Sequence, residues 1–179
     1  KVNLGYMRQK VCMVGLASGV VLGTLGYTHC CIEDLSIMRS IPGISVVSPA
    51  DCGETVKAVL AAVEHHESVY IRLTGGPNNP IVYAEDYEYQ IGKAVKLTDG
   101  KEISIIATGT MVHEALEVAR LLESVDISTA VYNMHTVKPI DVSVIDSVCK
   151  ASQLVVTIEE HSVIGGLGSA VAEKLTAIP

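Results

Sequence analysis

His29 follows a glycine-rich stretch and is the residue of this sequence best suited to acid–base chemistry. Four glycines lie between residues 15 and 26. Because glycine lets the backbone bend and come close to a ligand, this stretch can carry an imidazole to a binding site. A histidine in a polar, glycine-rich loop is more typical of a ligand contact than of a core, and its near-neutral pKa suits proton transfer. We expect His29 to meet an anionic or acid–base ligand.

Arg72 is the second candidate, because it stands near the end of a predicted strand over residues 69–73. Ligands of open α/β sheets bind beside the carboxyl ends of the strands. A guanidinium there can bind a phosphate through two parallel hydrogen bonds. The alternative is a surface arginine in a salt bridge at the rim, and the sequence leaves both interpretations open.

Other histidines have weaker support. His161 precedes a Gly-Gly-x-Gly run at residues 165–168, which opens a predicted helix, and a helix N-terminus attracts anions. This run alone is a weak signal and has no Walker lysine, so we interpret it as packing. His65 and His66 end a predicted helix, where we interpret them as C-terminal cations rather than a metal pair.

The elements that must position these residues alternate between apolar strands and amphipathic helices. The first half predicts strands over residues 11–16, 44–47 and 69–73, and helices over residues 35–40 and 54–66. Glu33 and Asp34 place acids at the start of the first helix, and Asp51 is the expected N-cap of the second. The inner face of the second helix is expected to comprise its regularly spaced apolar residues, Val56, Val59, Leu60 and Val63.

The second half repeats this alternation. It predicts strands over residues 103–107, 127–131 and 154–158, and helices after Thr110, over residues 141–151, and after the glycines at 165–168. Strands that alternate with helices favour parallel sheets with crossover helices. The fold class is therefore α/β, with two parallel-sheet domains: residues 1–83, a linker over residues 84–99, and residues 100–179.

Composition narrows the functional class. The chain has 179 residues, of which 49% are hydrophobic, and a net charge of −7. A negative chain argues against a nucleic-acid surface, and no apolar run reaches the ~18 residues of a membrane span. The five cysteines are odd in number and lack a Cys-x-x-Cys spacing, which favours reduced thiols and a cytoplasmic location.

The stretch around His29 resembles the transketolase family, in the domain that binds the pyrimidine ring of thiamine diphosphate. The matching positions share the order and spacing of the family pattern and are Gly26, Thr28, His29, Glu33, Asp34, Met38, Arg39, Ile41, Pro42, Pro49, Ala50 and Asp51. The second half is similar to the C-terminal domain of the same family. That similarity rests on residues 107–109, 137–141, 159–161 and 165–169.

The resemblance implies an enzyme part that transfers a two-carbon ketol unit between sugar phosphates with thiamine diphosphate and Mg²⁺. It makes His29 a catalytic and substrate-binding residue and Arg72 a substrate-binding residue for the sugar phosphate. It places the activating glutamate, and the N-terminal domain or subunit that holds the diphosphate and its metal, outside this sequence. The piece alone is therefore expected to be inactive, within a complete protein that forms a homodimer.

Two positions depart from the family pattern, which has an acidic residue where this chain has Leu25 and, in many members, a histidine near Ala17. They leave open three alternatives to transketolase activity. The first is a deoxyxylulose-phosphate synthase-like reaction with pyruvate, and the second a keto-acid dehydrogenase beta-like subunit. The third is an assembly subunit that keeps the fold without the chemistry.

Overall fold

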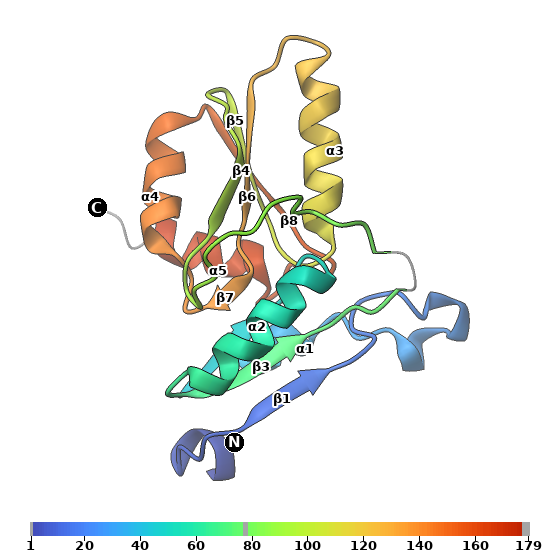
Figure 1. Ribbon diagram of the computed structural model, residues 1–179, viewed down its shortest axis with the longest axis vertical. Helices are drawn as coiled ribbons and strands as arrows, with labels where there is room; N and C mark the ends of the chain where they lie inside the picture. Colours follow the sequence, from blue (N-terminus) through green and yellow to red (C-terminus); the bar gives the residue numbers. More distant parts are fainter. Residues whose placement is uncertain (1, 77–78, 177–179) are drawn as a thin grey trace.

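Two four-stranded sheets, each covered by helices, form the structure. A computed structural model describes residues 2–76 and 79–176 of the chain (Figure 1). The first sheet has the order β1-β3-β2-β7 and the second the order β4-β6-β5-β8. The prediction of two α/β units is thereby confirmed, while the domain bounds at residues 83 and 100 stay a prediction.

Three parallel strands form the body of the first sheet. They are β1 (Cys12–Gly15), β2 (Ile44–Val47) and β3 (Ser68–Arg72), with β3 between the other two. A short π-helical turn (Val2–Tyr6) precedes β1. All four residues of β2 are buried, as expected of a strand covered on both faces.

Helices α1 (Asp34–Arg39) and α2 (Cys52–Glu64) pack with the first sheet. Asp51 caps α2 as predicted, because its Oδ1 accepts a hydrogen bond of 2.7 Å from the backbone N–H of Glu54. The core beside α2 includes Ala58, Ala62 and Ile71. Small side chains on this face let the helix approach the strands closely.

The prediction for the inner face of α2 is wrong. Val56, Val59, Leu60 and Val63 are between 41% and 65% exposed, whereas Glu54, Ala58 and Ala62 are buried. The buried residues recur every four positions and form a stripe of their own. Hydrophobicity alone predicts that the larger apolar side chains of α2 face the sheet. In the structure the small side chains Ala58 and Ala62 pack against the sheet instead.

The second sheet contains β5 (Ile103–Ala107), β6 (Thr129–Asn133) and β8 (Leu154–Ile158) in parallel, close to the predicted strands. Helix α3 (Met111–Glu123) covers one face, and α4 (Val142–Ala151) and α5 (Leu167–Leu175) cover the other (Figure 1). Successive residues of β5 show this division, since Ile105 packs with the α3 core and Ile106 with the α4 and α5 core.

Each sheet also contains an antiparallel strand that sequence analysis did not predict. Strand β4 (Val95–Thr98), within the predicted linker at residues 84–99, pairs with β6. Strand β7 (Thr136–Lys138) pairs with β2 of the first sheet, although it follows β6 in the chain. The two halves are therefore joined through a shared sheet. Within the described ranges, 2–76 and 79–176, no helix has the length and apolar character needed to cross a membrane.

Candidate functional site

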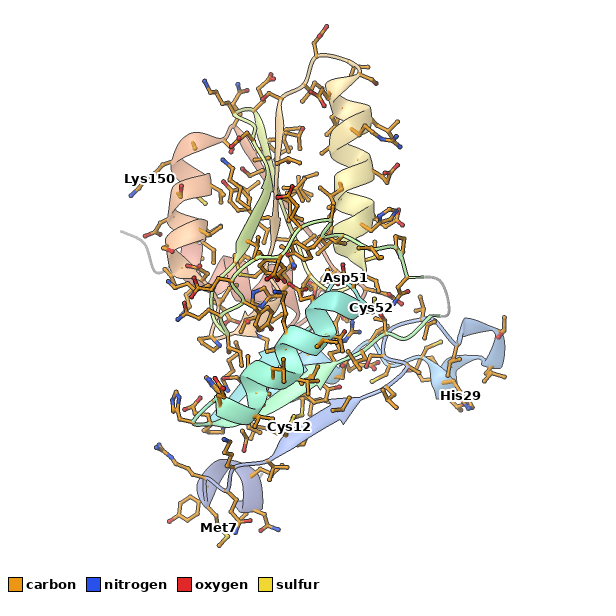
Figure 2. The ribbon with its side chains drawn as sticks, in the orientation of Figure 1. Met7, Cys12, His29, Asp51, Cys52 and Lys150 are labelled. Carbon is orange, nitrogen blue, oxygen red and sulfur yellow. The ribbon has the colours of Figure 1, made fainter. Side chains whose placement is uncertain are left out.

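His29 ends a short 3₁₀ turn, Tyr27–His29, on an exposed loop of the first half. Gly26 precedes this turn with a φ of 83°, which a side chain would strain. The hydroxyl Oγ1 of Thr28 lies 3.0 Å from Nδ1 of the imidazole. Figure 2 shows His29 at the outer end of the loop, away from Asp51 and Cys52. With Nδ1 occupied, Nε2 is the nitrogen that can meet a ligand.

Backbone hydrogen bonds close the base of this loop. The N–H of Gly19 donates to the carbonyl of Cys31 at 2.7 Å, and the N–H of Cys31 donates back at 2.9 Å. The N–H of Ser18 donates to the carbonyl of Leu73, just after β3. The first residues of the loop are therefore fixed at the carboxyl end of the sheet, where the sequence predicted ligand contacts.

Glu160 joins the loop to the second half. It follows β8 and accepts a hydrogen bond of 2.6 Å from the backbone N–H of Val20 through Oε1, while Thr110 Oγ1 donates to Oε2 at 3.1 Å. A small cleft of about 180 Å³ opens here, and its lining includes Val20, Thr74, Asn79, Thr110 and Glu160. A larger cavity of about 330 Å³ shares Thr74, Gly76 and Asn79 with it, whereas the cavities of about 700, 510 and 340 Å³ have no lining residue in common with it.

Arg72 is buried, with 2% of its surface exposed. Its Nε donates to both carboxylate oxygens of Asp34, at 2.9 and 3.1 Å, and its Nη2 donates to the carbonyl of Glu160 at 2.8 Å. For Nη1 no hydrogen bond to the described residues is found. The guanidinium thus links α1, β3 and the end of β8, and its binding of substrate stays a prediction.

Asp34 begins α1, as the sequence predicted, and its carboxylate contacts β3. Besides Arg72 it accepts a hydrogen bond of 2.9 Å from the hydroxyl of Tyr70. Burial and the negative charge of Asp34 raise the pKa of Tyr70, so this hydroxyl stays a donor. The carboxylate is buried and completes an ionic contact that the sequence pattern did not indicate, because its partner lies 38 residues away.

The glycine run before α5 serves packing, as the sequence indicated. Glu159 fills the helix N-terminus, since its carboxylate accepts hydrogen bonds from the backbone N–H of Leu167 at 2.5 Å and of Gly168 at 2.9 Å. Nε2 of His161 accepts a hydrogen bond of 3.2 Å from the backbone N–H of Leu35. An internal carboxylate thus occupies the place where an anionic ligand would bind.

A buried network that the sequence did not predict surrounds Glu54. Its carboxylate accepts hydrogen bonds from the N–H of Ala50 (2.6 Å), the hydroxyl of Tyr87 (2.6 Å) and the amide of Asn133 (2.9 and 3.0 Å). Burial raises the pKa of Glu54. This network joins α2 to the segment after residue 79 and to β6. A single glutamate in a predicted amphipathic helix does not indicate that its carboxylate is buried in a hydrogen-bond network.

The fold and the site define a class: an α/β protein of two sheets whose candidate ligand residues lie on a loop (His29) and at the carboxyl end of a parallel strand (Arg72). Family models agree with this description. The pyrimidine-binding domain of transketolase matches residues 2–76, and the transketolase C-terminal domain matches residues 92–178. The chain belongs to the transketolase family.

Curated relatives support this assignment at substantial identity. A subunit of the apulose-4-phosphate transketolase of Phocaeicola vulgatus is 38% identical over 180 residues, covering 100% of this chain and 57% of that protein. A putative transketolase C-terminal section of Methanocaldococcus jannaschii is 38% identical over 176 residues, covering 97% and 54%. The chain thus spans about half the length of these relatives.

Solved structures show the same fold. A structure described as a split gene transketolase, inactive beta4 tetramer, superposes with a TM-score of 0.88 at 38% identity, covering 98% of this chain and 56% of that one. A transketolase mutant of Pichia stipitis superposes with a TM-score of 0.68 at 24% identity, covering 90% and 25%, which indicates the fold alone.

The small cleft at the base of the loop that carries His29 suits only part of thiamine diphosphate. The cleft beside Glu160 is lined by Val20 and Val21, which fit an uncharged ring, and its described lining contains no cationic side chain. A diphosphate with its Mg²⁺ requires N–H or cationic donors and oxygen ligands. The described lining of this cleft therefore offers no cationic side chain to the diphosphate half of the cofactor.

Proposed function

We propose that this chain is the C-terminal part of a split transketolase, which transfers a two-carbon ketol unit between sugar phosphates together with a diphosphate-binding N-terminal subunit. The observation that carries the proposal is the exposed His29 on a loop anchored by Glu160. Similarity to proteins named as a transketolase subunit and as a transketolase C-terminal section supports the split arrangement. Thiamine diphosphate, when bound with Mg²⁺ in the complete assembly, supplies the carbanion chemistry.

The role proposed for this chain is acid–base help and substrate positioning. Thr28 holds Nδ1 of His29, so the lone pair or proton at Nε2 faces the ligand and can serve a sugar hydroxyl or carbonyl. The segment 18–20, bonded to Leu73 and Glu160, keeps the base of the loop in place. Such anchoring limits reorganisation of the site during the reaction.

The decisive experiment is the His29→Ala substitution. It is made in the complete protein, which contains the partner subunit and two copies of this chain. We expect kcat/KM for ketol transfer to fall on the order of 10²-fold, or about 3 kcal/mol in the barrier, through loss of acid–base help and substrate contact. Stability should change by less than ~1 kcal/mol, because the side chain is exposed. His113→Ala on α3 is the matched control and should keep full activity. A destabilised variant with unchanged kinetics would make His29 a structural residue.

Leu25 and Ala17 support a second candidate, a non-catalytic assembly subunit. Leu25 is an exposed apolar residue beside the His29 turn, and Ala17 has a φ of 57° in the turn after β1. If His29→Ala changes neither the rate of ketol transfer nor the stability of the chain, His29 has no catalytic role and the assembly-subunit interpretation is favoured.

A donor assay with pyruvate in place of a ketose phosphate separates the synthase-like alternative from transketolase.

A further inference from the structure

His65, His66 and Glu67 lie together where α2 ends and β3 begins. One potential ligand atom from each of the three side chains lies within 4.8 Å of the other two. The rings of His65 and His66 are tilted by 46° with their centroids 4.7 Å apart. Figure 1 places this junction at the end of α2 away from the loop that carries His29. Three consecutive residues at a helix end thus bring two imidazole nitrogens and one carboxylate oxygen near one another.

From this arrangement we propose that His65, His66 and Glu67 bind a borderline divalent transition-metal ion such as Zn²⁺. Two imidazoles and a carboxylate are a donor set that suits zinc and its neighbours, whereas Mg²⁺ and Ca²⁺ prefer oxygen ligands. Ligand atoms of a tetrahedral zinc, bound at about 2.0–2.2 Å, lie roughly 3.5 Å apart. The exposed His66 side chain and the partly exposed Glu67 can close the remaining distance by rotation.

A buried hydroxyl fixes the orientation of His65. Ser45 on β2 is fully buried, and its Oγ lies 3.0 Å from Nε2 of the imidazole. Metal-binding histidines characteristically use their second ring nitrogen for such a contact, which selects the tautomer and holds the ring. If Nε2 donates to Ser45, the lone pair of Nδ1 is left for the metal.

The proposed site gives His65 a different role from the helix-terminal cation predicted from the sequence.

The test is a titration of the full chain with Zn²⁺ by calorimetry near pH 7.5, with Mg²⁺ as the comparison ion. We expect one equivalent of Zn²⁺ to bind with a Kd on the order of 10 μM and Mg²⁺ not to bind. His66→Ala and Glu67→Gln should each weaken Zn²⁺ binding at least 10-fold, and Ser45→Ala, which removes only the contact to His65, about 10-fold. His113→Ala, which removes a distant histidine, should leave the Kd unchanged.

Cobalt distinguishes this site from the free cysteines. Co²⁺ at His65, His66 and Glu67 should give visible absorption bands without the near-ultraviolet charge transfer of thiolate ligation. Circular dichroism checks that each variant is folded, and His66→Ala is the safest because its side chain is exposed. Thiolate bands, or equal loss of binding in the His66 and His113 variants, would overturn the proposal. Absence of saturable Zn²⁺ binding by ~1 mM would do so as well.

Discussion

His29 and Arg72, the two candidate ligand-binding side chains, lie in completely different environments. His29 is exposed and contacts Thr28, so its removal disturbs little of the fold. Arg72 is buried against Asp34 and the carbonyl of Glu160. A functional side chain on a loop can be replaced at low cost, whereas a buried guanidinium supports the elements around it.

His135 gives a prediction for pH dependence at the residue scale. It is fully buried beside the ring of Tyr89, and burial lowers its pKa to about 4, with the charge of Asp141 acting in the opposite direction. The folded state therefore favours the neutral imidazole. Its contribution is fully present above about pH 6.5 and is lost as the pH falls toward 4, by about 2 kcal/mol at pH 5.

Urea denaturation of the wild type and His135→Asn at pH 7 and pH 5 measures this effect. The loss of stability between the two pH values should be smaller by about 2 kcal/mol in the variant. An unchanged pH dependence in the His135 variant would mean that another group titrates.

At the scale of elements, Arg72 and Asp34 connect β3 with α1. We expect Arg72→Met to lower the free energy of unfolding by about 3–5 kcal/mol, because it leaves a buried carboxylate without its partner. The double variant Arg72→Met, Asp34→Leu should lose less than the sum of the two single changes. Arg120→Met, in an exposed pair with Glu117, should change stability by less than ~0.5 kcal/mol.

Chemical denaturation measures these stabilities. The affinity of the assembled protein for its substrate tests the alternative, that Arg72 binds the substrate. If Arg72→Met keeps its denaturation midpoint and only weakens the binding of a sugar phosphate, Arg72 is a substrate ligand. A large loss of stability with little change in the substrate KM per folded molecule would instead limit Arg72 to joining the elements.

The same scale shows what sequence could predict. Strands β2, β5 and β8 are apolar runs bounded by turn residues, so their bounds followed from composition. Strands β4 and β7 have only four and three residues and include Lys96 and Lys138, which hides them. The contacts of Glu160 with Val20 and Thr110 span 140 and 50 residues, and no local pattern encodes such pairs. His29 was identifiable because its signal is local.

The whole molecule consists of two halves that share structure. Strand β7 extends the first sheet, Glu160 holds the loop before His29, and Asn133 of β6 donates to Glu54 of α2. These contacts fix the candidate site relative to both sheets. Even so, the chain spans about half the length of the relatives it matches, and its described cleft suits a ring without a diphosphate.

We therefore expect this chain alone neither to bind thiamine diphosphate tightly nor to transfer ketol units between sugar phosphates. The physical reason is that the diphosphate and Mg²⁺ contribute most of the charge of the cofactor, and their donors are proposed to lie in the partner subunit. Calorimetry with thiamine diphosphate and Mg²⁺ should show no binding at a Kd of ~1 μM, about 8 kcal/mol, until the partner is added. Tight binding by the chain alone would contradict the proposed division of the site. The mixture of both chains should bind the cofactor tightly, and His29→Ala should leave this binding intact while it reduces kcat/KM. That result would assign cofactor binding to the partner and the proton chemistry to this chain.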